Sequence, residues 1–105
     1  MRLWVDDERV APDGWLWAKT AEEAIRLLEE NQVEKMSLDH DLGDVDSNPE
    51  KTGYTVLTYV ESRVVWDPDY VAPAIRIHTA NVSARKKMEL GRDSIERLMS
   101  IKVGK

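Results

Sequence analysis

Two acidic stretches could carry chemistry in this chain, because each comes directly after a short apolar run. Asp6 and Asp7 follow the apolar residues 3–5, and the run 39–41, which reads Asp-His-Asp, follows residues 36–38. Carboxylates are costly to bury without a partner. At the end of a strand they can instead face the crevice in which open α/β sheets bind ligands. The two stretches therefore predict one acidic site at the edge of a sheet.

Such a site needs a positive counter-charge. Four carboxylates that lie close together cannot all stay ionised on their own, and a bound cation is the simplest remedy. All-oxygen ligands prefer Mg²⁺ or Mn²⁺, and phosphate chemistry is a common reason for such an ion. The predicted metal ligands are Asp6, Asp7, Asp39 and Asp41.

Two histidines belong to the same predicted site. His40 stands between the two acids of the second stretch, and His78 ends the predicted strand 74–78. Imidazole suits a general acid that protonates a departing alkoxide. We therefore expect Asp39, His40 and His78 to be the catalytic residues. A histidine at a strand end can also simply be held by hydrogen bonds, and for His78 both interpretations stay open.

A phosphate site is predicted where the last helix begins. Backbone amides at a helix N-terminus form an anion site, and this helix follows Asn81 and carries Arg85, Lys86 and Lys87 in its first turn. Basic residues there oppose the helix macrodipole, so helix stability does not explain them, although part of the run can be a solvated face. Arg85, together with Arg9, is expected to clamp phosphate oxygens.

The elements that must position these residues alternate in type along the chain. Strands are expected over residues 2–5, 14–19, 36–38 and 74–78. Helices are expected over residues 20–30, which Thr20 and Glu23 begin with a capping box, over residues 52–64, and over roughly 17 residues from Ser83. Residues 43–51 are a predicted loop, and residues 100–105 are a frayed helix end or a short fifth strand.

This order predicts an α/β fold with a parallel sheet of four or five strands and helices on both faces. Trp15 and Trp17 share one face of their strand, and Leu16 and Ala18 share the other. Large apolar groups on both faces favour a sheet that is covered on both sides. Both tryptophans are therefore expected in the core, with base stacking as the alternative. Right-handed crossovers bring the carboxyl ends of the strands to one edge, where the acids and His78 would meet.

Composition narrows the class of protein. The chain has 105 residues, which predicts a single domain over residues 1–105. Its 20 acidic residues outnumber its 15 basic ones, so non-specific DNA binding is not expected. It has no cysteine, which excludes disulfides and thiolate chemistry and fits the cytoplasm. No apolar run approaches the length of a membrane span, and no signal peptide is expected.

A paired acid after the first strand and a lone Asp after a later one resemble the receiver domain of two-component signalling. The resemblance implies a flavodoxin-like fold, Mg²⁺ bound near Asp39, and a phosphoryl group accepted by Asp39. Thr79 stands where receivers carry Ser or Thr, so it joins the predicted phosphate ligands. Asn81 joins them because it stands at the start of the last helix. Two features depart from receivers. No helix fits between the first two strands, and the receiver lysine has no counterpart unless the tail supplies Lys102 or Lys105.

The chain as a whole is more similar to a compact receiver-like family proposed to process cyclic phosphates. The most specific shared piece is Ser-Leu-Asp-His-Asp-Leu-Gly at residues 37–43. The other shared pieces are residues 6–9 with Pro12 and Trp15, residues 20–24, Gly53-Tyr54 with Val56-Leu57, and residues 78–81 with Arg85 and Met88. The resemblance implies a receiver-like fold and a small phosphorylated ligand or an RNA end as the partner.

Three functions follow as hypotheses. The first is a metal-dependent phosphoesterase that acts on a cyclic phosphate, such as a 2′,3′-cyclic RNA end or a cyclic nucleotide. The second is a receiver-type switch in which Asp39 is phosphorylated and no ester is cleaved. The third is a module that binds a phosphorylated ligand without turnover. The oligomeric state stays open.

Overall fold

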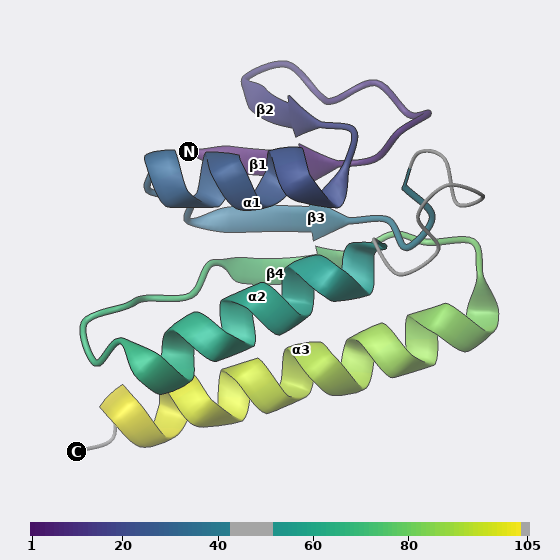
Figure 1. Ribbon diagram of the computed structural model, residues 1–105. Coiled ribbons are helices and arrows are strands. Elements are labelled where there is room, and N and C mark those ends of the chain that lie inside the picture. Colours follow the sequence, from purple (N-terminus) through teal and green to yellow (C-terminus); the bar gives the residue numbers. More distant parts are fainter. Residues whose placement is uncertain (43–51, 104–105) are drawn as a thin grey trace.

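Four parallel strands form the centre of the molecule (Figure 1). The computed structural model describes residues 1–42 and 52–103, so the predicted loop 43–51 and Lys105 lie outside the described residues. The strands are β1 (Arg2–Val5), β2 (Trp15–Ala18), β3 (Lys35–Leu38) and β4 (Ala74–Ile77), in the spatial order β2-β1-β3-β4. This arrangement confirms the α/β class, the four strands and the receiver-like fold.

One face of the sheet forms the core. The register places one apolar side chain from each strand in a row across the sheet, and the strands contribute two such rows. The rows are Leu3, Leu16, Met36 and Ile75, then Val5, Ala18, Leu38 and Ile77. All but Leu16 are buried, and Leu16 packs against the same cluster. We refer to this side as the covered face.

The part of the chain that the structure describes has three helices, and their starts follow local hydrogen bonding. They are α1 (Ala21–Glu30), α2 (Gly53–Trp66) and α3 (Val82–Val103). The Thr20 hydroxyl accepts the Glu23 amide at the start of α1, as predicted. At α2 the Thr52 hydroxyl accepts the Tyr54 amide, and Thr55 bonds back to the Thr52 amide. The predicted apolar stripe of α2 is buried in full: Val56, Leu57, Val60 and Val64.

The last helix differs from its predicted bounds. It begins one residue before Ser83, because the Asn81 side chain, rather than that of Ser83, accepts the Ala84 amide (3.1 Å). It continues to Val103, so residues 100–103 are helical and the fifth-strand alternative is wrong for them. Among the described residues, no helix combines the length and apolar character needed to cross a membrane.

The described helices all lie against the covered face, which corrects the prediction of helices on both faces. In Figure 1, α1 passes in front of β1 and β3, and α2 lies in front of β4. The cause is the strand order. The steps from β2 through β1 to β3 and from β3 to β4 run in one direction across the sheet, so right-handed crossovers put α1 and α2 on one side. The opposite step, from β1 to β2, is a loop without a helix.

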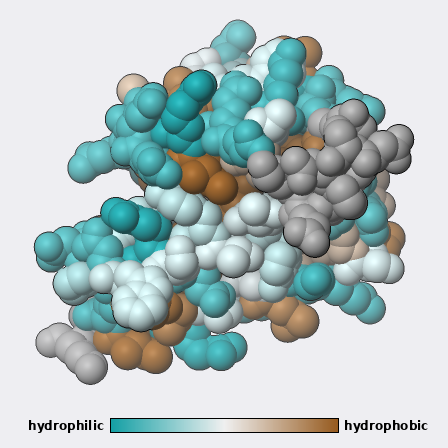
Figure 2. Space-filling model, viewed as in Figure 1, coloured by the Kyte–Doolittle hydropathy of each residue, from teal (hydrophilic) through white to brown (hydrophobic). Residues whose placement is uncertain are grey.

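We refer to the other side of the sheet as the open face. Its strand side chains are Arg2, Trp4, Trp15, Trp17, Lys35, Ser37, Ala74 and Arg76. Arg2, Lys35, Ala74 and Arg76 are exposed. The prediction that Trp15 and Trp17 lie in the core is therefore wrong, because both are only partly buried and neither packs against the core cluster. Figure 2 views the opposite, helix-bearing side, whose surface is mostly hydrophilic.

Candidate functional site

Three of the predicted acids meet at the carboxyl edge of the sheet. Asp6 and Asp7 follow β1, and Asp39 follows β3, which is the neighbour of β1. Each offers a carboxylate oxygen, and these oxygens lie within 4.8 Å of one another. The backbone of Asp39 donates to the Val5 carbonyl (2.9 Å), which continues the ladder up to the site. The predicted convergence is thus present for Asp6, Asp7 and Asp39.

Asp41 is not a member of this acidic cluster. Its side chain is 59% exposed and pairs with His40, with 2.8 Å between the Asp41 carboxylate and His40 Nδ1. The pleat alternation that aims side chains within a strand ends at Leu38, so it does not direct a residue three positions later. Asp41 therefore orients the His40 ring.

Asp6 is fully buried, and its carboxylate is nevertheless well satisfied. Oδ1 accepts the amides of Glu8 (2.8 Å) and Arg9 (2.9 Å), and Oδ2 is 3.0 Å from His78 Nε2. Burial raises the pKa of Asp6, but the Arg9 and Glu8 amides and His78 together outweigh it, so the pKa lies below its ordinary value. Asp6 is accordingly ionised at neutral pH.

His78 uses both ring nitrogens inside the protein. Nε2 faces Asp6, and Nδ1 lies 2.6 Å from the Ser37 hydroxyl. Because an ionised carboxylate only accepts, the hydrogen bond to Asp6 requires a hydrogen on Nε2. The imidazole also stacks on Trp4, with 4.2 Å between ring centroids and an interplanar angle of 8°. His78 therefore holds Asp6 in place.

The chain of Ser37, His78 and Asp6 has the composition of a nucleophilic triad, but its geometry does not suit that role. Ser37 is only 2% exposed. Its hydroxyl lies on the open face beneath the ring that it contacts, so a substrate cannot reach it. A nucleophile must approach the reacting atom closely. We therefore read the three residues as a support for the acidic cluster.

Gly53 brings the start of α2 against the acidic cluster. Its amide donates to the His40 carbonyl (2.9 Å). A Cβ on Gly53 would lie 2.0 Å from the Asp39 carbonyl oxygen and 3.0 Å from the Met88 methyl carbon. Glycine is therefore required here for close packing, and the helix N-terminus and the end of β3 form one unit.

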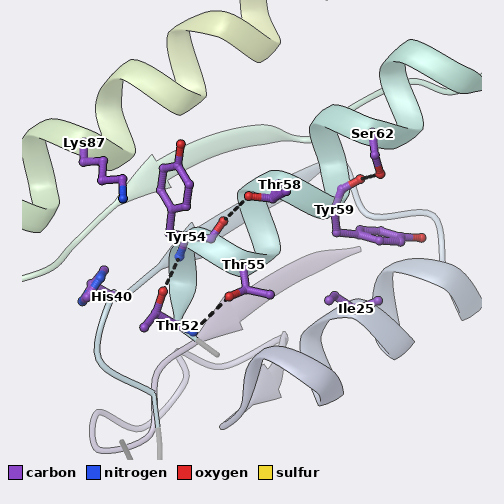
Figure 3. Close-up of a pocket in the computed structure, with 9 residues that line it drawn as sticks. All are labelled: Ile25, His40, Thr52, Tyr54, Thr55, Thr58, Tyr59, Ser62 and Lys87. Carbon is purple, nitrogen blue, oxygen red and sulfur yellow. Dashed lines mark hydrogen bonds between the residues drawn. The ribbon is translucent and has the colours of Figure 1, made fainter. Parts of the chain in front are cut away.

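His40 points into a pocket beside α2 (Figure 3). The Asp39 carboxylate accepts the His40 amide (2.7 Å), while the ring is 24% exposed and makes no described hydrogen bond through Nε2. The pocket has a volume of about 660 Å³ and places His40 and Lys87 near one end. Its lining residues are Ile25, His40, Thr52, Tyr54, Thr55, Thr58, Tyr59, Ser62 and Lys87. The three clustered acids do not line it, so His40 lies between two different environments.

The four predicted phosphate ligands occupy different situations. Arg9 is exposed, and its guanidinium donates to the His78 carbonyl (3.2 Å) across the carboxyl edge. Arg85 is exposed in the first turn of α3. Thr79 is buried and accepts the Asn81 amide, and Asn81 caps α3 with its side chain. The two arginines are exposed to solvent, whereas Thr79 and Asn81 shape the turn between β4 and α3.

The acidic cluster fits a hard divalent cation by the chemistry of its donors. Only carboxylate oxygens are offered, which suits Mg²⁺ or Mn²⁺ better than metals that prefer nitrogen or sulfur. A carboxylate has about four acceptor positions. Asp6 uses two of them on Oδ1 and one on Oδ2, so Oδ2 retains one. Three protein ligands would also leave positions for water and a substrate oxygen, as Mg²⁺ usually requires.

The lysine of ordinary receivers has no counterpart at this site among the described residues. Lys102 lies in α3, and its ammonium donates to the carbonyls of Val64, Asp67 and Tyr70 at 2.8–3.2 Å. Lys102 thus binds carbonyls at the C-terminus of α2, whereas Gly53 lies at the N-terminus of that helix. Lys102 was a candidate for the receiver lysine only if the tail formed a strand, and the helix through Val103 excludes it.

Comparison with known proteins agrees with this geometry. The cyclic-phosphate processing receiver domain matches the chain over residues 1–93. The chain belongs to this family. No curated protein and no solved structure matches it. Residues 1–93 include the whole sheet, the acidic cluster and both histidines, so the cyclic-phosphate processing receiver domain contains every site residue described above.

Several contacts at the site were not anticipated from the sequence of this cyclic-phosphate processing receiver domain. They are the Ser37–His78 hydrogen bond and the stack of His78 on Trp4, whereas the meeting of His78 with the acids was predicted. The sequence did carry one signal for these contacts. Trp4 and Ser37 each stand two residues before an acid of the cluster, and His78 directly follows a strand. Pairing these positions requires the strand register, which the sequence does not state.

Proposed function

We propose that this domain is a metal-dependent phosphoesterase that opens cyclic phosphates. The observation that supports the proposal is the acidic cluster: three carboxylates from two adjacent strands lie within 4.8 Å in a member of a cyclic-phosphate processing family. Asp6, Asp7 and Asp39 would hold the ion. A divalent cation supplies charge neutralisation at phosphoryl oxygens and activation of water.

In the proposed reaction, water attacks phosphorus and one ester bond of the cyclic phosphate breaks. Phosphorus gains the water oxygen, and the departing ester oxygen takes a proton and becomes a hydroxyl. We assign His40 as the general acid, because its Nε2 has no described partner whereas both nitrogens of His78 are engaged. The His40–Asp41 hydrogen bond keeps the ring oriented. Arg9 and Arg85 are exposed cations suited to binding the phosphate oxygens.

The first experiment is a hydrolysis assay on 2′,3′-cyclic nucleotides, cyclic dinucleotides and a short RNA with a 2′,3′-cyclic end. Each would be incubated with Mg²⁺, with Mn²⁺ and with chelator. We expect metal-dependent formation of a phosphomonoester that is lost in Asp39→Asn. The matched control for turnover is Asp13→Asn, which removes an exposed acid from outside the cluster and away from His40.

Metal binding gives a second readout that does not depend on turnover. Titration of Mn²⁺ followed by electron paramagnetic resonance should show one site in the wild type and in Asp41→Asn, and loss of that site in Asp39→Asn. Retained metal binding and activity in Asp39→Asn would contradict the proposal. Ligand binding without any turnover would instead favour the non-catalytic module, and an acid-labile adduct on Asp39 would favour the receiver-type switch.

A further inference from the structure

The open face combines aromatic and positively charged side chains in one layer. Of its eight strand residues, three are tryptophans and three are cations, and none is an acid. This is a local reversal, because acids outnumber bases by 20 to 15 in the whole chain. Arg2, Lys35 and Arg76 are exposed on this face, so their charge is available to a partner.

The tryptophans form a connected aromatic surface. Trp4 meets the ring of Trp15 edge-on, with 6.0 Å between centroids, and it stacks on His78 on the way to the acidic cluster. Cations line the edge strand as well, since Arg2 lies 5.8 Å from the Trp15 ring and Lys19 lies 4.5 Å from the Trp17 ring. Trp17 donates its indole N–H to the Asp6 carbonyl and Trp4 donates to the Arg9 carbonyl, whereas the Trp15 indole has no described hydrogen bond.

Burial shows that these aromatics are not core residues. None of the three packs against the core cluster. All are only partly buried, and no described helix covers them. Aromatic side chains next to cations on a sheet suit unpaired nucleobases, which stack on the rings while the phosphates meet the cations. Four-stranded sheets used in this way stack two or three bases.

We propose that the open face binds single-stranded RNA, with bases stacked over Trp15 and its neighbours and phosphates near Arg76 and Lys35. Charge complementarity selects a polyanion, and the aromatic surface selects one that carries bases. The face is also continuous with the acidic cluster through Trp4, His78 and Asp6. The four residues of each β-strand span about 13 Å at about 3.3 Å each. Because the face is this short, an RNA bound along it can have its end at the acidic cluster. The placement of that end rests on the proposed function, and the binding itself does not.

The test is fluorescence anisotropy of a labelled short RNA in the presence of chelator, so that no ester is cleaved. Trp15→Ala should weaken binding about tenfold, the effect of losing one stacked base. Arg76→Ala should weaken binding and reduce the salt dependence by about one phosphate contact. The matched control is Trp66→Ala, because Trp66 is 83% exposed at the end of α2 and does not belong to the open face. It should bind RNA as the wild type does.

Further arms separate this inference from its alternatives. Inorganic polyphosphate, which has no bases, should bind more weakly and be insensitive to Trp15→Ala. A cyclic phosphate of glycerol should be hydrolysed equally well by the wild type and by Trp15→Ala if the proposed reaction occurs. RNA binding that depends on Trp15 supports the inference even if no substrate is hydrolysed.

The inference is overturned if the wild type fails to bind RNA, or if Trp15→Ala and Arg76→Ala both bind it as tightly as the wild type. It is also overturned if the wild type forms a dimer in sedimentation velocity that Trp15→Ala dissociates, because the open face is then an interface between copies. Circular dichroism of each variant checks its fold. The Arg76 side chain is exposed and makes no described hydrogen bond, so Arg76→Ala should fold and can test the inference even if Trp15→Ala misfolds.

Discussion

The two faces of the sheet are built from the same four strands yet carry opposite kinds of side chain. The covered face presents two apolar rows to the helices, and its side chains are buried or packed against the core. The open face presents tryptophans and cations, and it leads to the residues that hold Asp6. The two faces therefore have different roles: the covered face holds the fold together, and the open face carries Trp4 and Ser37, which hold the His78 ring against Asp6.

The largest expected effect tests the covered face. Met36→Ala should lower the free energy of unfolding by about 4 kcal/mol, because Met36 is fully buried in the centre of the sheet and the substitution leaves a cavity. Arg76→Ala, on the next strand but on the open face, should change it by less than about 0.5 kcal/mol. Urea denaturation of both variants measures the difference. Equal losses would mean that both faces support the fold alike.

Two helical glycines sharpen the comparison at the junction of helix and site. Gly53→Ala should cost about 3 kcal/mol, because its Cβ would meet the backbone oxygen of Asp39, which cannot move without displacing the acidic cluster. Gly91→Ala is the control. Its Cβ would make ordinary contacts at 3.5 and 3.6 Å, so improved helix propensity should stabilise the protein by up to about 1 kcal/mol.

Both glycine variants can be measured by urea denaturation together with Mn²⁺ titration. Gly53→Ala should lose metal binding along with stability, and Gly91→Ala should keep it. A Gly53→Ala protein of unchanged stability would show that α2 can move away from Asp39 without cost, and that the close packing is not a constraint.

The two histidines have different expected roles: His78 supports Asp6, and His40 is the proposed general acid. His78→Ala should lower the free energy of unfolding by about 2 kcal/mol, because Ser37 and the buried carboxylate of Asp6 lose their partner. His40→Ala should leave the free energy of unfolding within about 0.5 kcal/mol, because the ring is partly exposed and pairs with an exposed acid. Under the proposed function it should nevertheless reduce turnover strongly. A His40→Ala enzyme with full activity would remove His40 from the reaction.

The smallest expected effect concerns Tyr70, which is partly buried against the core, and its contribution to stability in alkaline solution. Burial raises the pKa of Tyr70, the nearby Tyr59 raises it further, and Arg63 lowers it in part. The unfolded chain therefore releases this proton at lower pH than the folded one, so the free energy of unfolding falls as pH rises beyond about 10. Tyr70→Phe should reduce this fall by less than about 1 kcal/mol. Thermal melts between neutral and alkaline pH measure it, and an unchanged slope would contradict the assignment.

The sequence was sufficient to predict the strands, the helices and the meeting of three acids. Apolar runs and their acidic ends reveal which residues stop at the carboxyl edge, and crossover handedness then brings Asp6, Asp7 and Asp39 together. Asp41 was misplaced because the pleat no longer controls direction beyond β3. The open face was misread because alternating tryptophans look like a core pattern. The sequence did show that no helix fits between the first two strands. That this leaves one face of the sheet without a helix depends on the strand order, which only the structure supplies.

The ammonium of Lys102 has a consequence for where this domain ends. The family match stops at residue 93, inside α3, whereas Ile95 is buried in the core and Lys102 fastens α3 to the last carbonyls of α2. A fragment cut at the end of the match would expose the flank of α2 and leave three carbonyls without their cation. The physical boundary of the folding unit therefore lies at or beyond Lys102, and any fusion or truncation should be designed around that residue.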